Sequence, residues 1–293
     1  MASGTFISND YRASNGEVQE LINPATGEVS GTLTASSVND VDSAVAAARG
    51  AAPGWAAQTP GQRARVLLKL ADALEEDAET LTEREVTEGG KPWTTVLDGE
   101  IPFGADNLRF FAGAARSVDG TGAGMFSDGY TSMMVRRPVG VVAGITPWNF
   151  PLIMALWKAG PALAAGNTVI LKPAPLTPGS TLRLAELAAA AGLPAGVLNV
   201  VTGGGDIGSA LAGHRGADMV SVTGSTATGR AVMQGAVKDV KRVHLELGGK
   251  APALVFADAD VAQMARAVAL GATYNTGQDC TAATRVYIHR SIF

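Results

Sequence analysis

The spacing of hydrophobic residues predicts helices in the first part of the chain. In residues 40–49 and 62–85, apolar positions recur every three or four residues, with Glu and Arg between them. This period is that of amphipathic helices. Gly89-Gly90, with Pro92 beyond, indicates where the second helix ends. Earlier, Asn23-Pro24-Ala25-Thr26-Gly27 is typical of a turn between two short extended segments.

Further along, the pattern changes to short apolar runs that alternate with Ala-rich helical segments. Such alternation predicts an α/β fold in which helices cover both faces of a parallel sheet. Ligands of open sheets of this kind bind beyond the carboxyl ends of the strands. The apolar runs are residues 139–145, 168–171, 197–201, 219–222, 243–247 and 253–256.

Composition and charge narrow the class of protein. The 293 residues are 46% hydrophobic, and 23 basic against 27 acidic residues give a formal charge of -4. No run of Lys and Arg offers a surface for nucleic acid, so we expect no such partner. The chain does not open with a secretory signal, and no apolar run approaches the ~20 residues that cross a bilayer. We expect a globular, cytosolic protein without a membrane span.

Two glycine-containing turns are candidates for phosphate binding. Gly203-Gly204-Gly205-Asp206-Ile207-Gly208 matches the G-x-G-x-x-G pattern but lacks the acidic residue expected about 20 positions later. Gly224-Ser225-Thr226-Ala227-Thr228-Gly229 lacks the middle glycine, yet it opens a predicted helix and adds hydroxyl groups to the backbone N–H donors. We favour the turn at Ser225. The alternative is that both turns are structural.

Three polar residues stand at or beyond the ends of predicted strands. Lys172 would place its ammonium at the carboxyl edge of the sheet, near a ribose or phosphate. Asn149 lies between two prolines that restrict the backbone and help to direct its amide toward an oxyanion. Glu246 has apolar neighbours in sequence, so we expect it to be buried and suited to general-base work. The alternatives are a solvated lysine, a structural turn and an exposed or paired glutamate.

The single cysteine, Cys280, excludes an internal disulfide. It follows a predicted helix in a small polar stretch, where a thiol can be accessible as a nucleophile, although free cysteines are more often inert core residues. His214, His244 and His289 show neither an obvious pairing with the cysteine nor metal-ligand spacing. A hydrolase triad is therefore poorly supported, and no metal is expected.

Taken together, five motifs resemble the aldehyde dehydrogenase superfamily in order and spacing. The resemblance runs from the Asn23–Gly27 turn to the last residue. It implies a Rossmann-like doubly wound parallel sheet, followed by the beginning of a second α/β catalytic domain. The motifs are Pro147-Trp148-Asn149-Phe150-Pro151, Lys172-Pro173, Gly224-Ser225-Thr226-x-x-Gly229, Glu246-Leu247-Gly248-Gly249-Lys250 and Gly277-Gln278-x-Cys280.

The resemblance also implies roles for these residues. Cys280 would attack the aldehyde carbon, while the Asn149 amide and the Cys280 backbone N–H hold the oxyanion. After hydride leaves for the nicotinamide, Glu246 would activate the water that hydrolyses the thioester. The dinucleotide, NAD or NADP, would have its pyrophosphate near Ser225. It would lie against Thr146, Pro147, Trp148, Lys172, Gly203, Gly224, Ser225, Thr226, Gly229 and Leu247.

The same resemblance divides the chain into domains. Residues 1–118 and 140–247 would form the NAD(P)-binding domain, residues 119–139 an oligomerisation hairpin, and residues 248–293 the start of an incomplete catalytic domain. We expect an early strand of that domain at residues 285–289. Since family members continue well beyond this point, we expect a truncated chain whose complete form is a homo-oligomer.

Two positions bear on specificity. Family members commonly carry a glutamate three positions after the lysine, where it binds the adenine ribose hydroxyls; here that position is Pro175. Without the carboxylate, a 2′-phosphate meets no repulsion, so NADP is a candidate.

The Cys280 motif resembles the aminoaldehyde branch, including γ-aminobutyraldehyde dehydrogenases. Asp279 either faces the tunnel and attracts a substrate amine or stabilises a turn.

These observations lead to three hypotheses of function. The first is an oxidoreductase that oxidises an aldehyde, with an aminoaldehyde such as γ-aminobutyraldehyde as candidate substrate, to the acid. The second is a catalytically incompetent remnant that binds a dinucleotide and exposes apolar surface of an unfinished domain. The third is a related enzyme that reduces acyl phosphates or transfers acyl groups to coenzyme A, which Glu246 disfavours because such a base serves hydrolysis.

Overall fold

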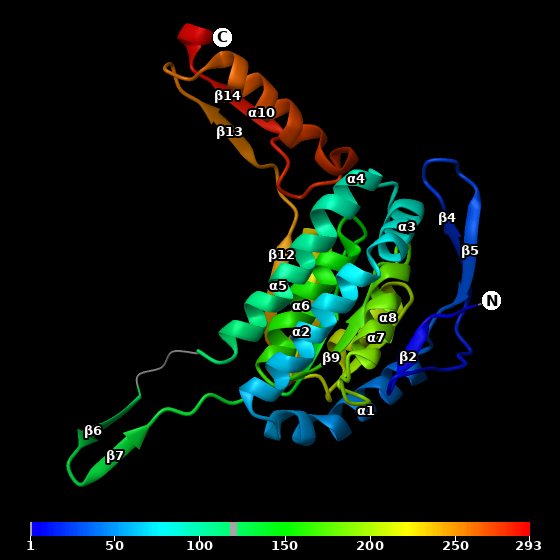
Figure 1. Ribbon diagram of the computed structural model, residues 1–293, viewed down its shortest axis with the longest axis vertical. Helices are drawn as coiled ribbons and strands as arrows, with labels where there is room; N and C mark the ends of the chain where they lie inside the picture. Colours follow the sequence, from blue (N-terminus) through cyan, green and yellow to red (C-terminus); the bar gives the residue numbers. More distant parts are fainter. Residues whose placement is uncertain (1, 118–121) are drawn as a thin grey trace.

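The computed structural model describes residues 2–117 and 122–293, and a seven-stranded sheet forms its centre (Figure 1). The order is β12-β11-β8-β9-β10-β2-β3, and β12 through β10 pair in parallel, which confirms the predicted α/β sheet. Antiparallel β2 and β3 extend the edge at β10. The strands are β2 (Thr5–Ile7), β3 (Asp10–Tyr11), β8 (Val141–Ile145), β9 (Thr168–Lys172), β10 (Leu198–Val201), β11 (Met219–Gly224) and β12 (Arg242–Leu247).

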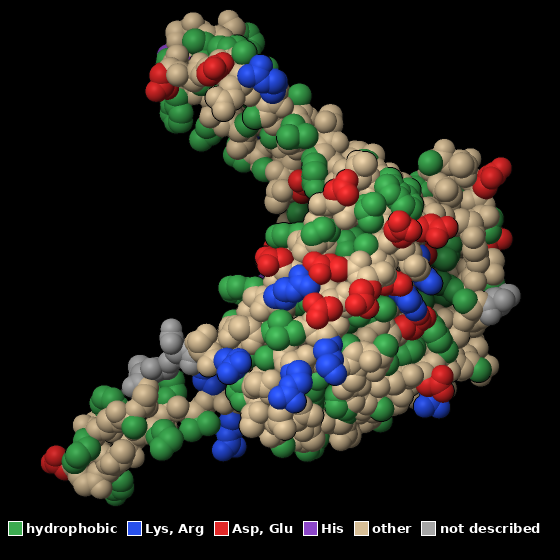
Figure 2. Space-filling model, in the orientation of Figure 1, with side chains coloured by type: hydrophobic (Ala, Val, Ile, Leu, Met, Phe, Trp, Pro, Cys, Tyr) green, Lys and Arg blue, Asp and Glu red, His purple; other side chains and the backbone are tan. Residues whose placement is uncertain are grey.

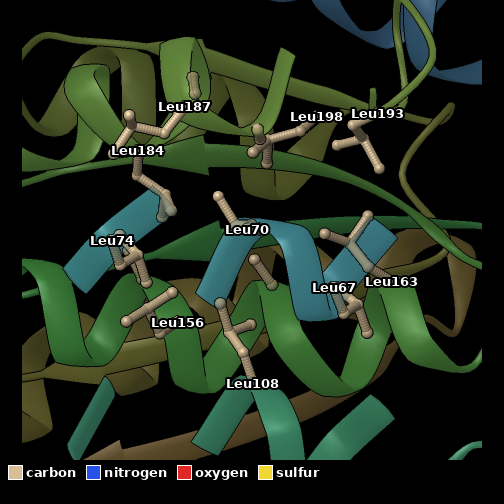
Figure 3. Packing of buried hydrophobic residues seen from close by; sticks show 14 of the residues in the cluster. Leu67, Leu70, Leu74, Leu108, Leu156, Leu163, Leu184, Leu187, Leu193 and Leu198 are labelled. Carbon is tan, nitrogen blue, oxygen red and sulfur yellow. The ribbon is translucent and has the colours of Figure 1, made fainter. Parts of the chain in front are cut away.

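Helices cover both faces of the sheet, so alternate strand residues enter two separate cores. Val141 and Ala143 belong to one core, whereas Val142, between them, belongs to the other. The first core also draws on α1 (Val38–Ala57), α8 (Gly205–Gly213) and α9 (Thr226–Ala236). Figure 3 shows the second core, where leucines of α6 (Pro151–Ala164) and α7 (Gly179–Ala190) meet those of α2 (Pro60–Glu76) and α5 (Ile101–Ala114). Burial on both faces explains the continuous apolar runs in the sequence.

The predicted helices exist, but their limits differ. The segment 40–49 is the middle of α1, which begins at a capping box between Ser37 and Asp40. The segment 62–85 is two helices rather than one, because α2 ends at Glu76 and α3 (Ala78–Gly89) follows. Asp77 at the break is held by Arg183 of α7 through two contacts of 2.7 and 2.8 Å. This long-range contact is not visible in local periodicity.

Smaller elements surround the sheet. The predicted turn at residues 23–27 joins antiparallel β4 (Val18–Ile22) and β5 (Val29–Thr34), and β1 (Ala2–Ser3) pairs with β5. As predicted, α3 ends where Gly90 adopts a left-handed conformation (φ +65). The short α4 (Trp93–Thr95) and the π-helix η1 (Val96–Glu100) lead into α5, and η2 (Val237–Asp239) and η4 (Arg290–Ile292) are single 3₁₀ turns.

Two segments project from the body of the molecule (Figure 1). One is the antiparallel hairpin of β6 (Ala123–Ser127) and β7 (Tyr130–Met133). Residues 119–121 of the predicted oligomerisation hairpin, and the domain boundary predicted at 118, lie outside the described residues. The other contains β13 (Pro252–Val255), α10 (Val261–Thr273), the 3₁₀ turn η3 (Tyr274–Gly277) and β14 (Arg285–Ile288).

The sequence pattern grouped residues 253–256 with the strands of the central sheet, and this prediction is wrong. β13 pairs with β14 in a separate parallel sheet, because the chain leaves the edge strand β12 through Gly248 and Gly249. The strand predicted at 285–289 is confirmed as β14. Figure 2 shows hydrophobic side chains on both projecting segments; in the second, Leu254, Phe256 and Leu270 are 63%, 68% and 65% exposed.

Within residues 2–117 and 122–293, no helix combines the length and apolar character needed to span a membrane.

Candidate active site

The topology of the sheet creates a crevice at its carboxyl edge. From β8 the chain first adds β9 and β10 on one side and then returns to place β11 and β12 on the other. Open sheets bind ligands where the strand order reverses in this way. A cavity of about 1270 Å³ opens there. The predicted site residues that line it are Thr146, Pro147, Trp148, Asn149, Lys172, Gly224, Ser225, Glu246, Leu247 and Cys280.

The turn at Ser225 has the geometry of a phosphate site. Ser225 is the N-cap of α9, and its Oγ accepts a hydrogen bond from the Thr228 backbone N–H at 3.1 Å. The first N–H groups of the helix therefore stand at the cavity, where they favour an anion. The competing turn also opens a helix, with Gly204 as N-cap of α8, but its first turn carries Asp206. A carboxylate there disfavours a second anion, so the turn at Ser225 remains the better candidate.

Three predicted cofactor residues lie beside the cavity lining. Thr226 is the first residue of α9. A side chain at Gly203 would place Cβ 2.6 Å from Ile207, and one at Gly229 would place it 2.9 Å from Leu247. Both distances are too short for a real contact. The two glycines thus allow close packing at the site, in the second case of α9 against β12.

Lys172 and Thr146 present unusual polar groups to the cavity. Lys172 is only 4% exposed, and its Nζ donates to the Pro173 carbonyl at 2.9 Å. Burial lowers the pKa of Lys172 to about 8, and the nearby Asp206 carboxylate opposes that shift. The buried Oγ1 of Thr146 has no hydrogen-bond partner among the described residues. A hydroxyl and an amine thus remain available to the hydroxyl and phosphate groups of a dinucleotide.

Asn149 is tied directly to the segment that carries the cysteine. Its Nδ2 donates to the Gln278 carbonyl at 2.9 Å, and Asn275 Nδ2 donates to the Asn149 carbonyl at 2.9 Å. Sequence analysis missed Asn275, which is buried with positive φ (50). Its signal was the Asn-Thr-Gly turn ahead of the cysteine, because Asn tolerates the left-handed conformation. These bonds bring the oxyanion candidate and Cys280 to the same wall of the cavity.

Cys280 is exposed, as a nucleophile requires. Partial burial of the thiol raises the pKa of Cys280 above its ordinary value, and the Asp279 and Glu246 carboxylates raise it further. Of the two interpretations of Asp279, the turn contact is present: its Oδ1 accepts from the Thr281 N–H and from the Thr281 hydroxyl, both at 2.9 Å.

The predicted burial of Glu246 is wrong. Its side chain is 59% exposed on β12, the edge strand of the sheet. Two neighbours that sequence analysis did not connect with it lie nearby: His244, and the buried Lys158 of α6. Burial lowers the pKa of Lys158 to about 8, and the Glu246 carboxylate opposes that shift. A lone cation in the apolar run 151–164 was the available signal for Lys158.

A doubly wound sheet with a helix N-terminus, a buried lysine and a cysteine at its switch point is the architecture of a nucleotide-binding oxidoreductase domain. The comparison with known families makes the assignment specific. The chain belongs to the Aldehyde dehydrogenase family, whose model matches residues 11–293.

Individual relatives agree with this assignment. The chain is 45% identical over 293 residues to the NADP/NAD-dependent aldehyde dehydrogenase PuuC of Escherichia coli, covering 98% of this chain and 59% of that protein. It is 41% identical over 295 residues to an aldehyde dehydrogenase of Alternaria alternata, covering 99% and 59%.

Solved structures give the same result. The NAD+ complex of an aldehyde dehydrogenase from Bacillus cereus matches with a TM-score of 0.96 and 40% identity, over 99% of this chain and 60% of that one. PnpE in complex with nicotinamide adenine dinucleotide matches with a TM-score of 0.96 and 40% identity, over 100% and 60%. The chain thus spans about 60% of the length of these relatives.

The surroundings of Cys280 predict how the thiol responds to a change of charge. Asp279→Asn removes a negative charge beside the sulfur, so we expect the pH midpoint of iodoacetamide alkylation to fall. The thiolate is the reactive form, and the chain has one cysteine, so the reaction reports on Cys280 alone. Asp258→Asn, at an exposed aspartate, is the control. An unchanged or higher midpoint in Asp279→Asn would contradict this electrostatic account.

Proposed function

We propose that this chain carries the cofactor-binding region and the nucleophile of an enzyme that oxidises an aldehyde to a carboxylic acid with NAD or NADP. The observation that carries the proposal is that Cys280, Asn149 and Glu246 line one cavity together with the N-terminus of α9. Because the chain spans about 60% of its relatives, the activity of the whole protein is part of the proposal.

Each residue has a definite task in this reaction. Cys280 Sγ, which is exposed, releases its proton to solvent water and bonds to the aldehyde carbon. The Asn149 amide and the Cys280 backbone N–H donate to the aldehyde oxygen as it gains negative charge. A bound nicotinamide supplies the chemistry of hydride acceptance. Glu246 then removes a proton from water as the water oxygen attacks the thioester carbon, which releases the carboxylic acid and returns the thiol.

Other residues in and beside the cavity lining fit the dinucleotide. Ser225 and the N-terminus of α9 suit the pyrophosphate. Lys172 and the Thr146 hydroxyl, which has no hydrogen-bond partner among the described residues, suit polar groups of the ribose or phosphate. NAD is named with PnpE and with the Bacillus cereus enzyme, and both coenzymes are named with PuuC. These relatives support NAD or NADP as the cofactor.

Several finer assignments belong to the same proposal. The division into an NAD(P)-binding domain (1–118 and 140–247), an oligomerisation hairpin (119–139) and the start of a catalytic domain (248–293) stays a prediction. Exposed Met125, Phe126 and Tyr130 on the projecting hairpin support assembly of a homo-oligomer. The cytosol stays the predicted compartment. An aminoaldehyde stays the predicted substrate class, although the Thr281 contacts occupy the Asp279 carboxylate.

The second candidate function is a dinucleotide-binding remnant without turnover. The exposed Leu254, Phe256 and Leu270 would need a further segment or another chain to cover them, and turnover would depend on that cover.

The direct test is turnover of the purified chain with NAD or NADP and a panel of aldehydes that includes γ-aminobutyraldehyde. Reduced cofactor is followed by absorbance. We expect turnover that disappears in Cys280→Ala and falls about 10²- to 10⁴-fold in Glu246→Gln, the range typical of a general base. Turnover only after fusion to a homologous C-terminal half would favour the remnant. Turnover that survives Cys280→Ala would refute the mechanism.

The proline near Lys172 predicts the coenzyme preference. Pro175 lines the cavity, so Pro175→Glu would add a carboxylate there. If the adenine ribose lies at this point, we expect the ratio of NADP to NAD dissociation constants to rise about tenfold through repulsion of the 2′-phosphate. Pro175→Gln, which adds the same bulk without charge, is the control. Equal ratios in the two variants would place the ribose elsewhere.

A further inference from the structure

One face of the strand pair β11–β12 carries a line of polar side chains beside the cavity. The strands pair in register, with Ser221 opposite His244 and Thr223 opposite Glu246. Alternate residues of a strand share a face, so these four side chains lie together. Lys158 of α6 contacts this face: its Nζ donates to Thr223 Oγ1 at 2.7 Å and to Ser221 Oγ at 3.4 Å.

The hydrogen bonds along this line have a defined order from donor to acceptor. Because the Lys158 ammonium donates to Ser221 Oγ, the Ser221 hydroxyl hydrogen is available to His244 Nδ1, which lies 2.9 Å from the oxygen. A neutral imidazole that accepts at Nδ1 carries its hydrogen on Nε2. In this structure His244 Nε2 lies 3.4 Å from Glu246 Oε1. The ring nitrogen nearest the carboxylate is thus the one that carries the hydrogen in this tautomer.

Glu246 needs such a neighbour, because packing does not hold it. Its side chain is 59% exposed on the edge strand, and a free glutamate samples many rotamers. The other end of the polar line, in contrast, is well packed, since Ser221 and Lys158 are both 5% exposed. The His244 imidazole contacts the buried Ser221 hydroxyl, so it can restrict the rotamers of the exposed Glu246 carboxylate.

We propose that His244, anchored by Ser221, is a positioning residue that holds the Glu246 carboxylate toward the thioester at Cys280. The inference rests on the proposed function, in which Glu246 is the base that activates water. His244 itself does not touch the reacting atoms. Its effect is confined to the hydrolysis of the acyl-enzyme, since attack by Cys280 does not use Glu246.

An ester substrate tests this step without a dinucleotide. p-Nitrophenyl acetate transfers its acetyl group to the Cys280 sulfur and releases nitrophenolate, and water then cleaves the thioester to acetate and thiol. The initial burst of nitrophenolate reports acylation, and the steady state reports deacylation. We expect His244→Leu to keep the burst and to lower the steady-state rate about tenfold, a fraction of what a positioned base contributes.

Matched variants separate positioning from general damage. His244→Gln puts an amide donor where Nε2 was, so the rate should stay within about twofold of the parent. Ser221→Ala removes the anchor of the imidazole, so its steady-state rate should lie between those of His244→Leu and His244→Gln. His289→Leu, in the projecting C-terminal segment, should not change the rate. In a Glu246→Gln background, His244→Leu should have no further effect, because it acts through the carboxylate.

The outcomes distinguish this inference from the function on which it rests. A parent protein without a burst would overturn the proposed function and the inference together. A burst in every variant, with the same steady-state rate in His244→Leu as in the parent, would overturn the inference alone. The inference alone would also be overturned if His244→Leu lowered the steady-state rate about tenfold in the Glu246→Gln background, since the effect would then not act through Glu246.

Discussion

The parallel strands β8, β9 and β10 are buried on both faces, and this constraint determines where the chemistry can lie. Inside the sheet, apolar side chains alternate between the two cores and leave little room for polar groups. Polar residues gather instead where strands end, and parallel strands end at one edge. Lys172 at the end of β9, Ser225 after β11 and Glu246 on β12 meet there for this reason.

A second constraint ties the cysteine to that edge. The segment before Cys280 is distant in sequence from β8, yet its Gln278 carbonyl accepts the Asn149 amide, and Gln278 Nε2 donates to the Gly89 carbonyl at 3.1 Å. Next to the loop that carries Asn149, the Lys91 side chain is fully buried. Its Nζ pairs with Glu85 at 2.9 Å and lies 4.8 Å from the Phe150 ring centroid. Breaking a buried pair of this kind is costly, so the loop that carries Asn149 has a rigid support.

The sequence predicted the parallel sheet and the convergence of most site residues, because both follow from the order of apolar runs and the residues at their ends. Other features depend on long-range contacts that local patterns do not contain. The helix predicted at 62–85 is interrupted at Asp77, whose carboxylate binds Arg183 of α7. The apolar neighbours of Glu246 in sequence predicted burial, but its side chain is 59% exposed on the edge strand β12. The pairing of His244 with Ser221 likewise appears only once the register of β11 and β12 is known.

We propose that the N-terminus of α9 holds the pyrophosphate of a dinucleotide beside Cys280, and calorimetric titration with NAD tests this placement directly. Ser225→Asn and Ser225→Asp both keep a good helix cap, but only the aspartate adds a negative charge where the pyrophosphate would lie. The account predicts that Ser225→Asn binds within about threefold of the parent and that Ser225→Asp binds at least about tenfold more weakly. Equal affinity of the parent and Ser225→Asp for NAD would contradict it.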